Sequence, residues 1–331
     1  MAETFRALLV EQAEPKRFTR SIVTRTLDNL AAGELVVRVR WSSLNYKDAL
    51  SATGHPGVTR NFPHTPGIDA AGEVVSDASG RFQPGDRVIV TGFDLGMETD
   101  GGYGQLIRIP TAWALPLPPG LELRDSMILG TAGLTAALSV HALVGRSVVP
   151  EAGEILVTGA TGGVGSVAVA LLARLGYRVV AATGKPEAAP FLSRLGAALT
   201  IPREEVTANV ERPMLKERWA GVIDCVGGDT LVAALKSTRY GGTVSCCGLV
   251  GSADLNLNVY PFILRGVSLL GIDSVQCPLA VRSAVWHKLA TEWRLPQLEQ
   301  LADECTLEGL EEKIAAILKG QLQGRTVVRL D

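Results

Sequence analysis

Cysteine is scarce in this chain of 331 residues, and every cysteine stands in its second half. The five are Cys225, Cys246, Cys247, Cys277 and Cys305, an odd number with no C-x-x-C spacing. This pattern argues against a disulfide framework and against a cysteine metal site. Cys246 and Cys247 fall in a valine- and glycine-rich strand pattern, where thiols behave as small hydrophobic groups. A reactive thiol at Cys246 or Cys247 is the open alternative.

An excess of charge of one sign is also lacking. The 32 basic and 34 acidic residues leave a net charge of −2, and the basic residues are dispersed. We therefore expect no nucleic-acid partner.

Long hydrophobic runs are missing as well. No uninterrupted apolar stretch reaches the length of a membrane span, so we expect no membrane partner. Residues 1–11 carry acidic side chains on both sides of a short apolar run, which predicts a first β-strand and not a secretory signal. A cytoplasmic location is the expectation.

The first part of the chain, up to about residue 125, shows short alternating patterns broken by glycine and proline, which predict a compact antiparallel barrel. The strands expected there are 35–41, 71–75, 86–90 and 101–110. A segment rich in helix breakers, 116–120, precedes a helical pattern at 125–144. A domain boundary is expected between these two patterns.

From about residue 150 strand and helix patterns alternate, which predicts a doubly wound parallel sheet with right-handed crossovers. Strands are expected at 155–158, 177–182, 198–201, 220–225, 242–247 and 267–272, and helices at 165–175, 187–195 and 231–236. A helix at 307–319 and a final strand at 324–331 are expected to return to the first domain. The predicted fold is α/β, with one domain at 1–125, completed by about 275–331, and the other at 126–274.

The most informative segment is the glycine turn at 159–165, which stands between an apolar strand pattern and a helix pattern of small residues. Gly159, Gly162 and Gly165 permit a sharp turn, close approach of a pyrophosphate to the backbone, and tight helix packing. The turn predicts a dinucleotide site in a Rossmann domain.

The end of the next strand indicates which dinucleotide is bound. Thr183-Gly184-Lys185 stands where NAD-binding folds usually place a carboxylate, and no Asp or Glu is present there. A lysine attracts a 2′-phosphate by roughly 4 kcal/mol at about 4 Å, and a carboxylate repels it by as much. NADPH is therefore predicted over NADH, with a solvated surface lysine as the alternative reading of Lys185.

Several motifs together resemble the medium-chain dehydrogenase/reductase superfamily, which combines a GroES-like β-barrel catalytic domain with a Rossmann domain. The resemblance spans the whole chain. The motifs are 45–48, 66–69, 84–88, 101–104 and the glycine turn. More narrowly, four segments resemble the zinc-independent, NADPH-dependent acrylyl-CoA reductase family, whose members are often named quinone oxidoreductases: 41–50, 60–63, 129–133 and 266–275.

The resemblance also implies that no metal is bound. Zinc-dependent relatives use a cysteine where this chain has Asn45, a histidine in the region of Gly67-Ile68-Asp69, and a further ligand near Thr131. None of these positions holds a soft or imidazole ligand, and the four-cysteine structural lobe is absent.

A reaction that suits such a site is conjugate reduction, in which hydride adds to the β-carbon of an activated alkene and the α-carbon receives a proton. Charge then collects on a conjugated oxygen, where hydrogen-bond donors stabilise it. By resemblance, Tyr46 contacts the cofactor and Tyr46 and Asn45 are the catalytic candidates, with packing of Tyr46 or a solvent proton as alternatives. Lys47 and Arg60 are candidates for CoA phosphate, and Asp48 is expected to fix the turn.

The resemblance implies the remaining cofactor contacts. Thr161, Gly162, Gly163 and Val164 would hold the pyrophosphate, and Thr183, Gly184, Lys185 and Arg203 would surround the 2′-phosphate. Leu249, Ile263 and Ser274 would line the nicotinamide. Relatives place an asparagine near the end of the last helix, where this chain has Gly320.

The leading hypothesis is therefore an NADPH-dependent reductase that converts acryloyl-CoA to propionyl-CoA. The alternatives are a quinone or enone reductase acting on a small-molecule quinone, and a crystallin-like NADPH-binding protein without essential catalysis. The apolar segment 267–272 predicts an edge strand that pairs with its twin in a homodimer.

Overall fold

The computed structural model describes residues 3–330. The chain forms two compact units. Unit 1 comprises the described residues up to Thr131, Val275–Ser283 and the residues from Leu301 onward, and unit 2 comprises Ala132–Ser274 and Ala284–Gln300. The segment 284–300 thus clusters with unit 2, whereas the sequence analysis grouped all of 275–331 with the first domain.

Unit 1 is built on a mainly antiparallel sheet. Its strands are β3 (Leu35–Leu44), β4 (Asp69–Asp77), β5 (Arg87–Thr91), β6 (Leu106–Ile109), β7 (Ala114–Pro116), β14 (Ala302–Thr306) and β15 (Arg325–Arg329). The order is β14-β15-β3-β4-β5-β7, with β6 also paired to β3, and only β14 and β15 run parallel among these pairs. The C-terminal tail returns to this sheet as predicted, because Thr326 pairs with Leu44.

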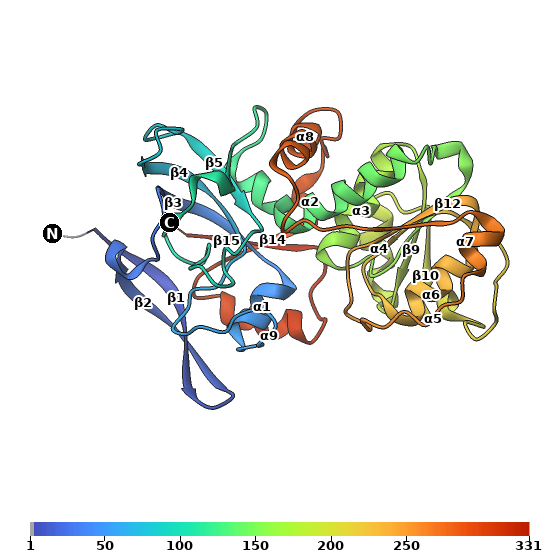
Figure 1. Ribbon diagram of the computed structural model, residues 1–331, viewed down its shortest axis with the longest axis horizontal. Coiled ribbons are helices and arrows are strands. Elements are labelled where there is room, and N and C mark those ends of the chain that lie inside the picture. The colour runs from blue at the N-terminus through green and yellow to red at the C-terminus, as the bar shows by residue number, and fades with distance from the viewer. Residues whose placement is uncertain (1–2, 331) are drawn as a thin grey trace. The chain divides into compact units, whose positions relative to one another are not determined.

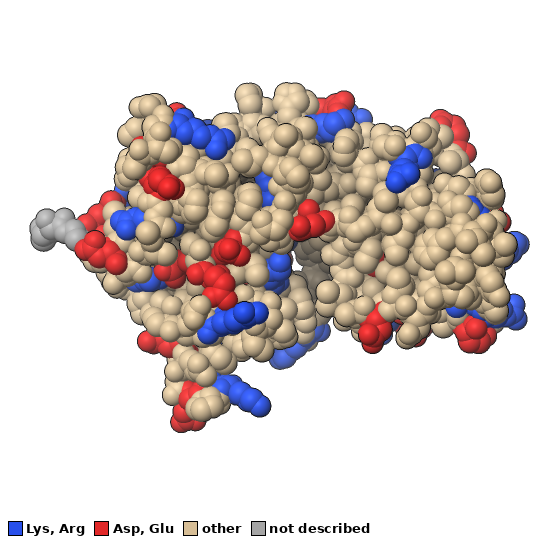
Figure 2. All heavy atoms as spheres, in the orientation of Figure 1, with Lys and Arg blue, Asp and Glu red and all other residues tan. Residues whose placement is uncertain are grey.

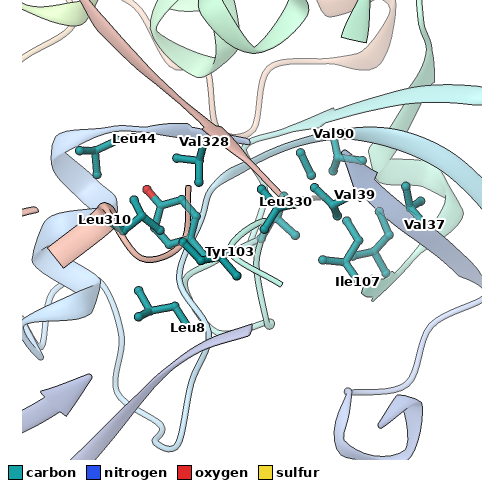
Figure 3. Close-up of a cluster of buried hydrophobic side chains, with 14 of the residues drawn as sticks. Leu8, Val37, Val39, Leu44, Val90, Tyr103, Ile107, Leu310, Val328 and Leu330 are labelled. Carbon is teal, nitrogen blue, oxygen red and sulfur yellow. The ribbon is translucent and has the colours of Figure 1, made fainter. Parts of the chain in front are cut away.

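A two-stranded antiparallel ribbon, β1 (Thr4–Glu14) and β2 (Arg17–Thr26), and two helices, α1 (Tyr46–Ala52) and α9 (Leu310–Leu318), complete the core of unit 1. Apolar side chains of the sheet, the ribbon and these helices form one buried cluster (Figure 3). The cluster includes Leu8, Val37, Val39, Leu44, Val90, Tyr103, Ile107, Leu310, Val328 and Leu330. This core holds β3 and β15 beside α1, the helix that carries Tyr46 at its first position.

Unit 2 is the predicted doubly wound parallel sheet. Its strands are β8 (Glu154–Val157), β9 (Arg178–Thr183), β10 (Leu199–Pro202), β11 (Trp219–Asp224), β12 (Thr238–Cys246) and β13 (Ser268–Gly271). All neighbouring pairs are parallel, in the order β10-β9-β8-β11-β12-β13. The order reverses at β8, and ligands of such sheets bind beyond the strand carboxyl ends at that point.

Helices cover this sheet (Figure 1): α3 (Gly163–Arg174), α4 (Ala189–Arg194), α5 (Arg203–Thr207), α6 (Gly228–Ser237) and α7 (Tyr260–Arg265). Their apolar faces and the strands share a buried core that includes Leu156, Val180, Trp219, Val222 and Leu235. Short 3-10 helices occur at Leu27–Asn29, Thr111–Trp113, Pro150–Ala152, Pro186–Ala188 and Leu298–Leu301.

The helix expected at 125–144 is present as α2 (Leu123–Gly145), and it contains a kink at Gly130, where φ is 54° and ψ is −157°. The division between the units falls within α2 and within α8 (Leu279–Ala290). Contrary to the expectation from hydrophobic runs, α2 is long and apolar enough to cross a membrane by length and composition. However, 78% of its most apolar window is buried inside the protein, as in the core helix of a globular fold.

The surface charges of each unit are mixed in sign. On the face shown in Figure 2, acidic and basic side chains are interspersed over each unit. This distribution agrees with the dispersed charges of the sequence and gives that face no broad basic surface of the kind that binds a phosphate backbone.

Candidate cofactor site and active site

The glycine turn connects β8 to α3 at the point in unit 2 where the strand order reverses. A β-carbon at Gly165 would lie 2.3 Å from the carbonyl oxygen of Gly159 and 2.7 Å from the α-carbon of Ala160. No side chain fits there, so the close packing of α3 over the turn requires glycine. Gly159 itself has φ 59°, in the left-handed region that favours glycine.

The first turn of α3 begins with Gly162 as its N-cap, and no side chain caps it. Backbone N–H groups in the first turn of a helix have no acceptor within the helix, so they are free to bind an anion. Thr161, Gly162, Gly163 and Val164 all lie at this terminus, with Thr161 buried and the three that follow accessible to solvent. The geometry suits the pyrophosphate for which these four residues were predicted.

A buried carboxylate supports the turn from the neighbouring strand. Asp224, the last residue of β11, accepts hydrogen bonds from the hydroxyl of Thr158 at 2.7 Å and from the N–H groups of Gly227 at 2.8 Å and Val226 at 3.3 Å. Thr158 in turn accepts a hydrogen bond from the N–H of Cys225 at 3.0 Å. Burial raises the pKa of Asp224, and these donors oppose the shift.

The hydrogen bond between Thr158 and Asp224 was not predicted from the sequence. A signal for it exists, because Asp224 is the one charged residue in the apolar strand Trp219–Asp224. A carboxylate in that position is costly unless hydrogen-bond donors surround it.

Four predicted cofactor residues gather at the adjacent carboxyl ends of β9 and β10. Thr183 ends β9 and is the register partner of Pro202, so Gly184 stands beside Arg203. A β-carbon on Gly184 would lie 3.1–3.2 Å from the Nε, Cδ and Cζ atoms of Arg203. The hydroxyl of Thr183 accepts a hydrogen bond from the N–H of Lys185 at 3.1 Å.

This group adjoins the glycine turn, because the N–H of Ala160 donates to the carbonyl of Ala182 at 3.2 Å. Two cations therefore stand beside an open glycine surface next to the anion site. Burial lowers the pKa of Lys185, and the nearby Glu187 opposes that shift. The side chain of Arg203 is exposed and pairs with Glu204 at 3.0 Å. The arrangement fits a 2′-phosphate.

Two of the three residues expected at the nicotinamide, Leu249 and Ser274, follow the carboxyl ends of the adjacent strands β12 and β13. Leu249 follows the carboxyl end of β12 and is exposed, while Ser274 follows β13, is buried, and accepts a hydrogen bond from Thr135 at 2.8 Å. Ile263 lies on α7, where Arg265 bonds the carbonyl oxygen of Thr238, the first residue of β12, at 3.3 Å. This contact places the end of α7, at Arg265, beside the start of β12, and the assignment of the exposed Ile263 to the nicotinamide stays a prediction.

Unit 1 contains a buried polar cluster around Asp69, the first residue of β4. Its carboxylate accepts hydrogen bonds from the N–H and hydroxyl of Thr131 at 2.9 and 2.6 Å and from Ser43. The Nη2 atom of Arg325 lies 3.9 Å from Asp69 Oδ2. Gly130 makes room for this cluster, because a β-carbon there would lie 2.6 Å from Asp69 Oδ2.

The same cluster corrects the role expected of Asn45. Its amide nitrogen donates to Asp69 Oδ2 at 2.8 Å and to Asp48 Oδ2 at 3.1 Å, and its amide oxygen accepts from Arg325 Nη1 at 3.1 Å. Both ends of this buried amide are therefore engaged inside the protein. Asn45 positions the start of α1 and does not donate to a thioester oxygen.

Asp48 has the role that was predicted for it, fixing the turn at the start of α1. Its carboxylate accepts from the N–H of Asn45 at 2.8 Å and from the N–H of Ile68 at 2.8 Å. Burial and the neighbouring Asp69 charge raise the pKa of Asp48 to about 7. Asp48 therefore holds its proton below about pH 7.

Tyr46 is the first residue of α1 and is 43% exposed. Within residues 3–330 its hydroxyl has no hydrogen-bond partner, so it is free to meet a ligand. Lys47 beside it is partly exposed, and Arg60 is exposed.

Gly320 lies just beyond α9 with φ 66°, and its N–H donates to the carbonyl of Ile317 at 2.9 Å, so it ends the helix.

No group of three or more histidine, cysteine, aspartate or glutamate side chains suited to a metal ion occurs in the described part of the chain. At Asn45 and Thr131, two positions where zinc-dependent relatives place ligands, the side chains are held in the hydrogen bonds around Asp69.

We predict that Asp48 makes the stability of the protein fall as pH rises. Its pKa is raised from 3.8 to about 7 in the folded state, so its contribution is complete below about pH 3.8 and is lost as pH passes 7. The free energy of unfolding should fall between pH 5 and 8 by up to about 1.4 kcal/mol per pH unit from this group. Denaturant unfolding at a series of pH values measures that slope.

Replacing Asp48 by Asn should remove this part of the slope, and replacing the exposed Asp28 by Asn should leave it in place. The buried His64, whose pKa is lowered by burial, acts in the opposite sense in all three proteins. The difference between variants therefore isolates Asp48. An unchanged slope in Asp48→Asn would show that the carboxyl is already ionised in the fold.

Family models match both parts of the chain. The Alcohol dehydrogenase GroES-like domain matches residues 31–119, and the Zinc-binding dehydrogenase domain matches residues 163–291. The first lies in unit 1, and the second begins within the glycine turn and covers the strands β9 to β13 that follow it.

Close relatives extend over the full length. The acrylyl-CoA reductase AcuI of Ruegeria pomeroyi is 46% identical over 325 residues, which cover 98% of each chain. The putative quinone oxidoreductase YhfP of Bacillus subtilis is 44% identical over 100% of each chain. The crystal structure of YhfP with NAD bound has a TM-score of 0.96 at 43% identity, covering 99% of this chain and 100% of that one.

The crystal structure of the yhdH oxidoreductase from Salmonella enterica in complex with NADP gives a TM-score of 0.95 at 43% identity, covering 98% of this chain and 100% of that one. These matches confirm the predicted GroES-like and Rossmann architecture. The chain belongs to the acrylyl-CoA reductase family, a zinc-independent branch of the medium-chain dehydrogenases/reductases.

Proposed function

We propose that this protein is an NADPH-dependent reductase of the carbon–carbon double bond of acryloyl-CoA, with propionyl-CoA as product. The observation that carries the proposal is the 46% identity over 98% of each chain with a protein named acrylyl-CoA reductase. Lys185 and Arg203 beside Gly184, together with the uncapped start of α3, suit the 2′-phosphate and the pyrophosphate of NADPH.

NADPH, when bound, supplies the hydride. The protein's own residues then have three tasks. The N–H groups at the start of α3 bind the pyrophosphate, and Lys185 and Arg203 attract the 2′-phosphate. Thr158 and Asp224 keep the glycine turn in place through the 2.7 Å hydrogen bond between them.

Tyr46 is the candidate for the substrate side. Its exposed hydroxyl has no hydrogen-bond partner within residues 3–330, and a phenolic hydroxyl can donate a hydrogen bond to an oxygen. We propose that this hydroxyl donates to the thioester oxygen, where negative charge collects as hydride reaches the β-carbon. Asn45 serves this role only indirectly, by holding the start of α1.

A quinone acceptor is the second candidate. It is favoured by the 44% identity with YhfP, a putative quinone oxidoreductase. Both reactions reduce a conjugated system and place charge on an oxygen, so the same donor serves either substrate. Turnover of the two substrate classes distinguishes them.

We predict that acryloyl-CoA is the better substrate. With NADPH, kcat/KM for acryloyl-CoA should exceed that for 1,4-benzoquinone by more than about tenfold, which is a transition-state difference of about 1.4 kcal/mol. The loss of absorbance of the reduced nicotinamide as NADPH is oxidised measures both rates. A preference for the quinone would reject the proposal in favour of the second candidate.

Tyr46→Phe is the informative variant in this assay. It keeps the ring and removes the hydroxyl, so kcat for acryloyl-CoA should fall by roughly 100-fold, the low end of the range for loss of one oxyanion donor or proton donor. Tyr240→Phe, at a residue of unit 2 that is 79% exposed, is the matched control. An unchanged kcat in Tyr46→Phe would leave this residue a packing role only.

We also propose that the protein is a homodimer. β13 is the terminal strand of the parallel sheet, and its residues Leu269 and Leu270 are only half-buried. Pairing with β13 of a second copy would satisfy its free backbone edge. Light scattering at micromolar concentration should give about twice the chain mass of 35.0 kDa, and a particle of a single chain mass would refute the proposal.

A further inference from the structure

Three cysteines gather at the carboxyl ends of β11 and β12 in unit 2. Asp224 is the register partner of Cys246, and the N–H of Cys247 donates to the carbonyl of Asp224 at 3.0 Å. This hydrogen bond extends the parallel register by one residue, so Cys225 and Cys247 face each other across the two strands. Their Sγ atoms lie 3.8 Å apart.

Cys246 is not part of this pair. Side chains alternate along a strand, so Cys246 points to the other face from Cys247. The Sγ atom of Cys246 lies 4.0 Å from the carbonyl oxygen of Gly248. Throughout residues 3–330 no group of three histidine, cysteine, aspartate or glutamate side chains is placed to bind a metal ion, so the three thiols do not form a metal site. The chemistry available to the cluster is that of two adjacent thiols.

The backbone at this point permits a disulfide. Neighbouring strands lie about 4.8 Å apart, within the range of about 4.4–6.8 Å between α-carbons that a disulfide requires. Rotation about the side-chain bonds must then bring the sulfurs from 3.8 Å to the S–S bond length of about 2.05 Å. Cys225 and Cys247 are both partly exposed residues, and burial of the Cys225 thiol makes Cys247 the one that a small reagent meets first.

We propose that Cys225 and Cys247 are a redox-sensitive thiol pair that forms a reversible disulfide with a low-molecular-weight disulfide as oxidant. The Cys247 thiol loses its proton and attacks one sulfur of the oxidant, which forms a mixed disulfide and releases one small thiolate. The Cys225 thiol then loses its proton and attacks Cys247 Sγ, which forms the protein disulfide and releases the second thiolate. Both protein thiols are oxidised, both oxidant sulfurs are reduced, and the two protons protonate the released thiolates.

The order of the two attacks follows from the local environment. The hydrogen bond with Cys247 and burial raise the pKa of the Cys225 thiol well above its usual value. A thiol attacks as its thiolate, so Cys225 reacts more readily once Cys247 has already placed a disulfide beside it. The overall reaction should therefore become faster as pH rises above neutrality.

The position of the pair connects it to the proposed cofactor site, and this part of the inference rests on the proposed function. A β-carbon on Gly159 would lie 3.4 Å from the Cβ atom of Cys225, and one on Gly248 would lie 2.1 Å from the carbonyl oxygen of Cys225. The loop after β12 is thus packed tightly against the backbone of Cys225, and the glycine turn lies next to the Cys225 side chain. Drawing the sulfurs together displaces these segments, so we infer that the disulfide lowers the affinity for NADPH.

The disulfide itself is tested on the full-length wild-type protein with oxidised glutathione. The thiol count after unfolding should fall from the five of the sequence to three, because two thiols are consumed, and dithiothreitol should restore five. Trypsin should release 219–236 and 240–265 as one linked species from the oxidised protein. Five thiols with no linked species, or a link between two chains, would overturn the proposal.

Substitutions identify the partners, because 240–265 contains both Cys246 and Cys247. The link should persist in Cys246→Ser and disappear in Cys247→Ser and Cys225→Ser. Loss of the link in Cys246→Ser, or its survival in Cys247→Ser, would show that Cys246 and not Cys247 is the partner of Cys225, and would overturn the proposed pair. Where a variant folds poorly, mass-spectrometric fragmentation of the linked wild-type peptides between residues 246 and 247 decides which cysteine carries the link.

Fluorescence titration with NADPH tests the consequence. The oxidised protein should bind NADPH more than about tenfold more weakly than the reduced protein, and by reciprocity saturating NADPH should shift the thiol–disulfide equilibrium by the same factor toward the reduced pair. A disulfide that leaves NADPH affinity unchanged would contradict the coupling. Absence of NADPH binding in both forms would contradict the proposed function, while the thiol count would still decide whether the pair is oxidised.

Discussion

The absence of a side chain at Gly165 is the constraint on which the cofactor half of the protein depends. With the Gly159 carbonyl 2.3 Å from where a β-carbon would stand, α3 can begin directly above the end of β8 only if this residue is glycine. That position aims the free N–H groups of the first helical turn at the point where the strand order reverses. The 2.7 Å hydrogen bond from Thr158 to Asp224 then fixes the turn to the next strand.

Unit 1 is organised by a different constraint, the need to satisfy two carboxylates buried side by side. Asp69 lies 3.9 Å from Arg325 and accepts hydrogen bonds from Thr131, Ser43 and Asn45, while burial and the neighbouring Asp69 raise the pKa of Asp48 to about 7. The consequence for function is geometric. The start of α1 is held rigidly through Asn45, and the next residue, Tyr46, is presented to solvent with its hydroxyl free to bind.

The parts of this account that were predictable from sequence are those carried by local pattern. Short apolar strands and the glycine spacing predict the parallel sheet and the turn, and the absence of a carboxylate after Thr183 indicates the phosphate pocket. The role of Asn45 was mistaken because its partners, Asp69 and Arg325, are 24 and 280 residues away in the sequence. The pairing of Cys225 with Cys247 depends on strand register, which periodicity does not specify.

The central claim is that the glycine turn and the cations beside Gly184 select a doubly phosphorylated adenosine. The most direct measurement is the ratio of kcat/KM for NADPH to that for NADH, in the wild-type protein and in Lys185→Ala. The account predicts a ratio above about 10 in the wild type, worth about 1.4 kcal/mol, that falls toward unity in the variant. A wild-type preference for NADH, or a ratio that Lys185→Ala leaves unchanged, would contradict it.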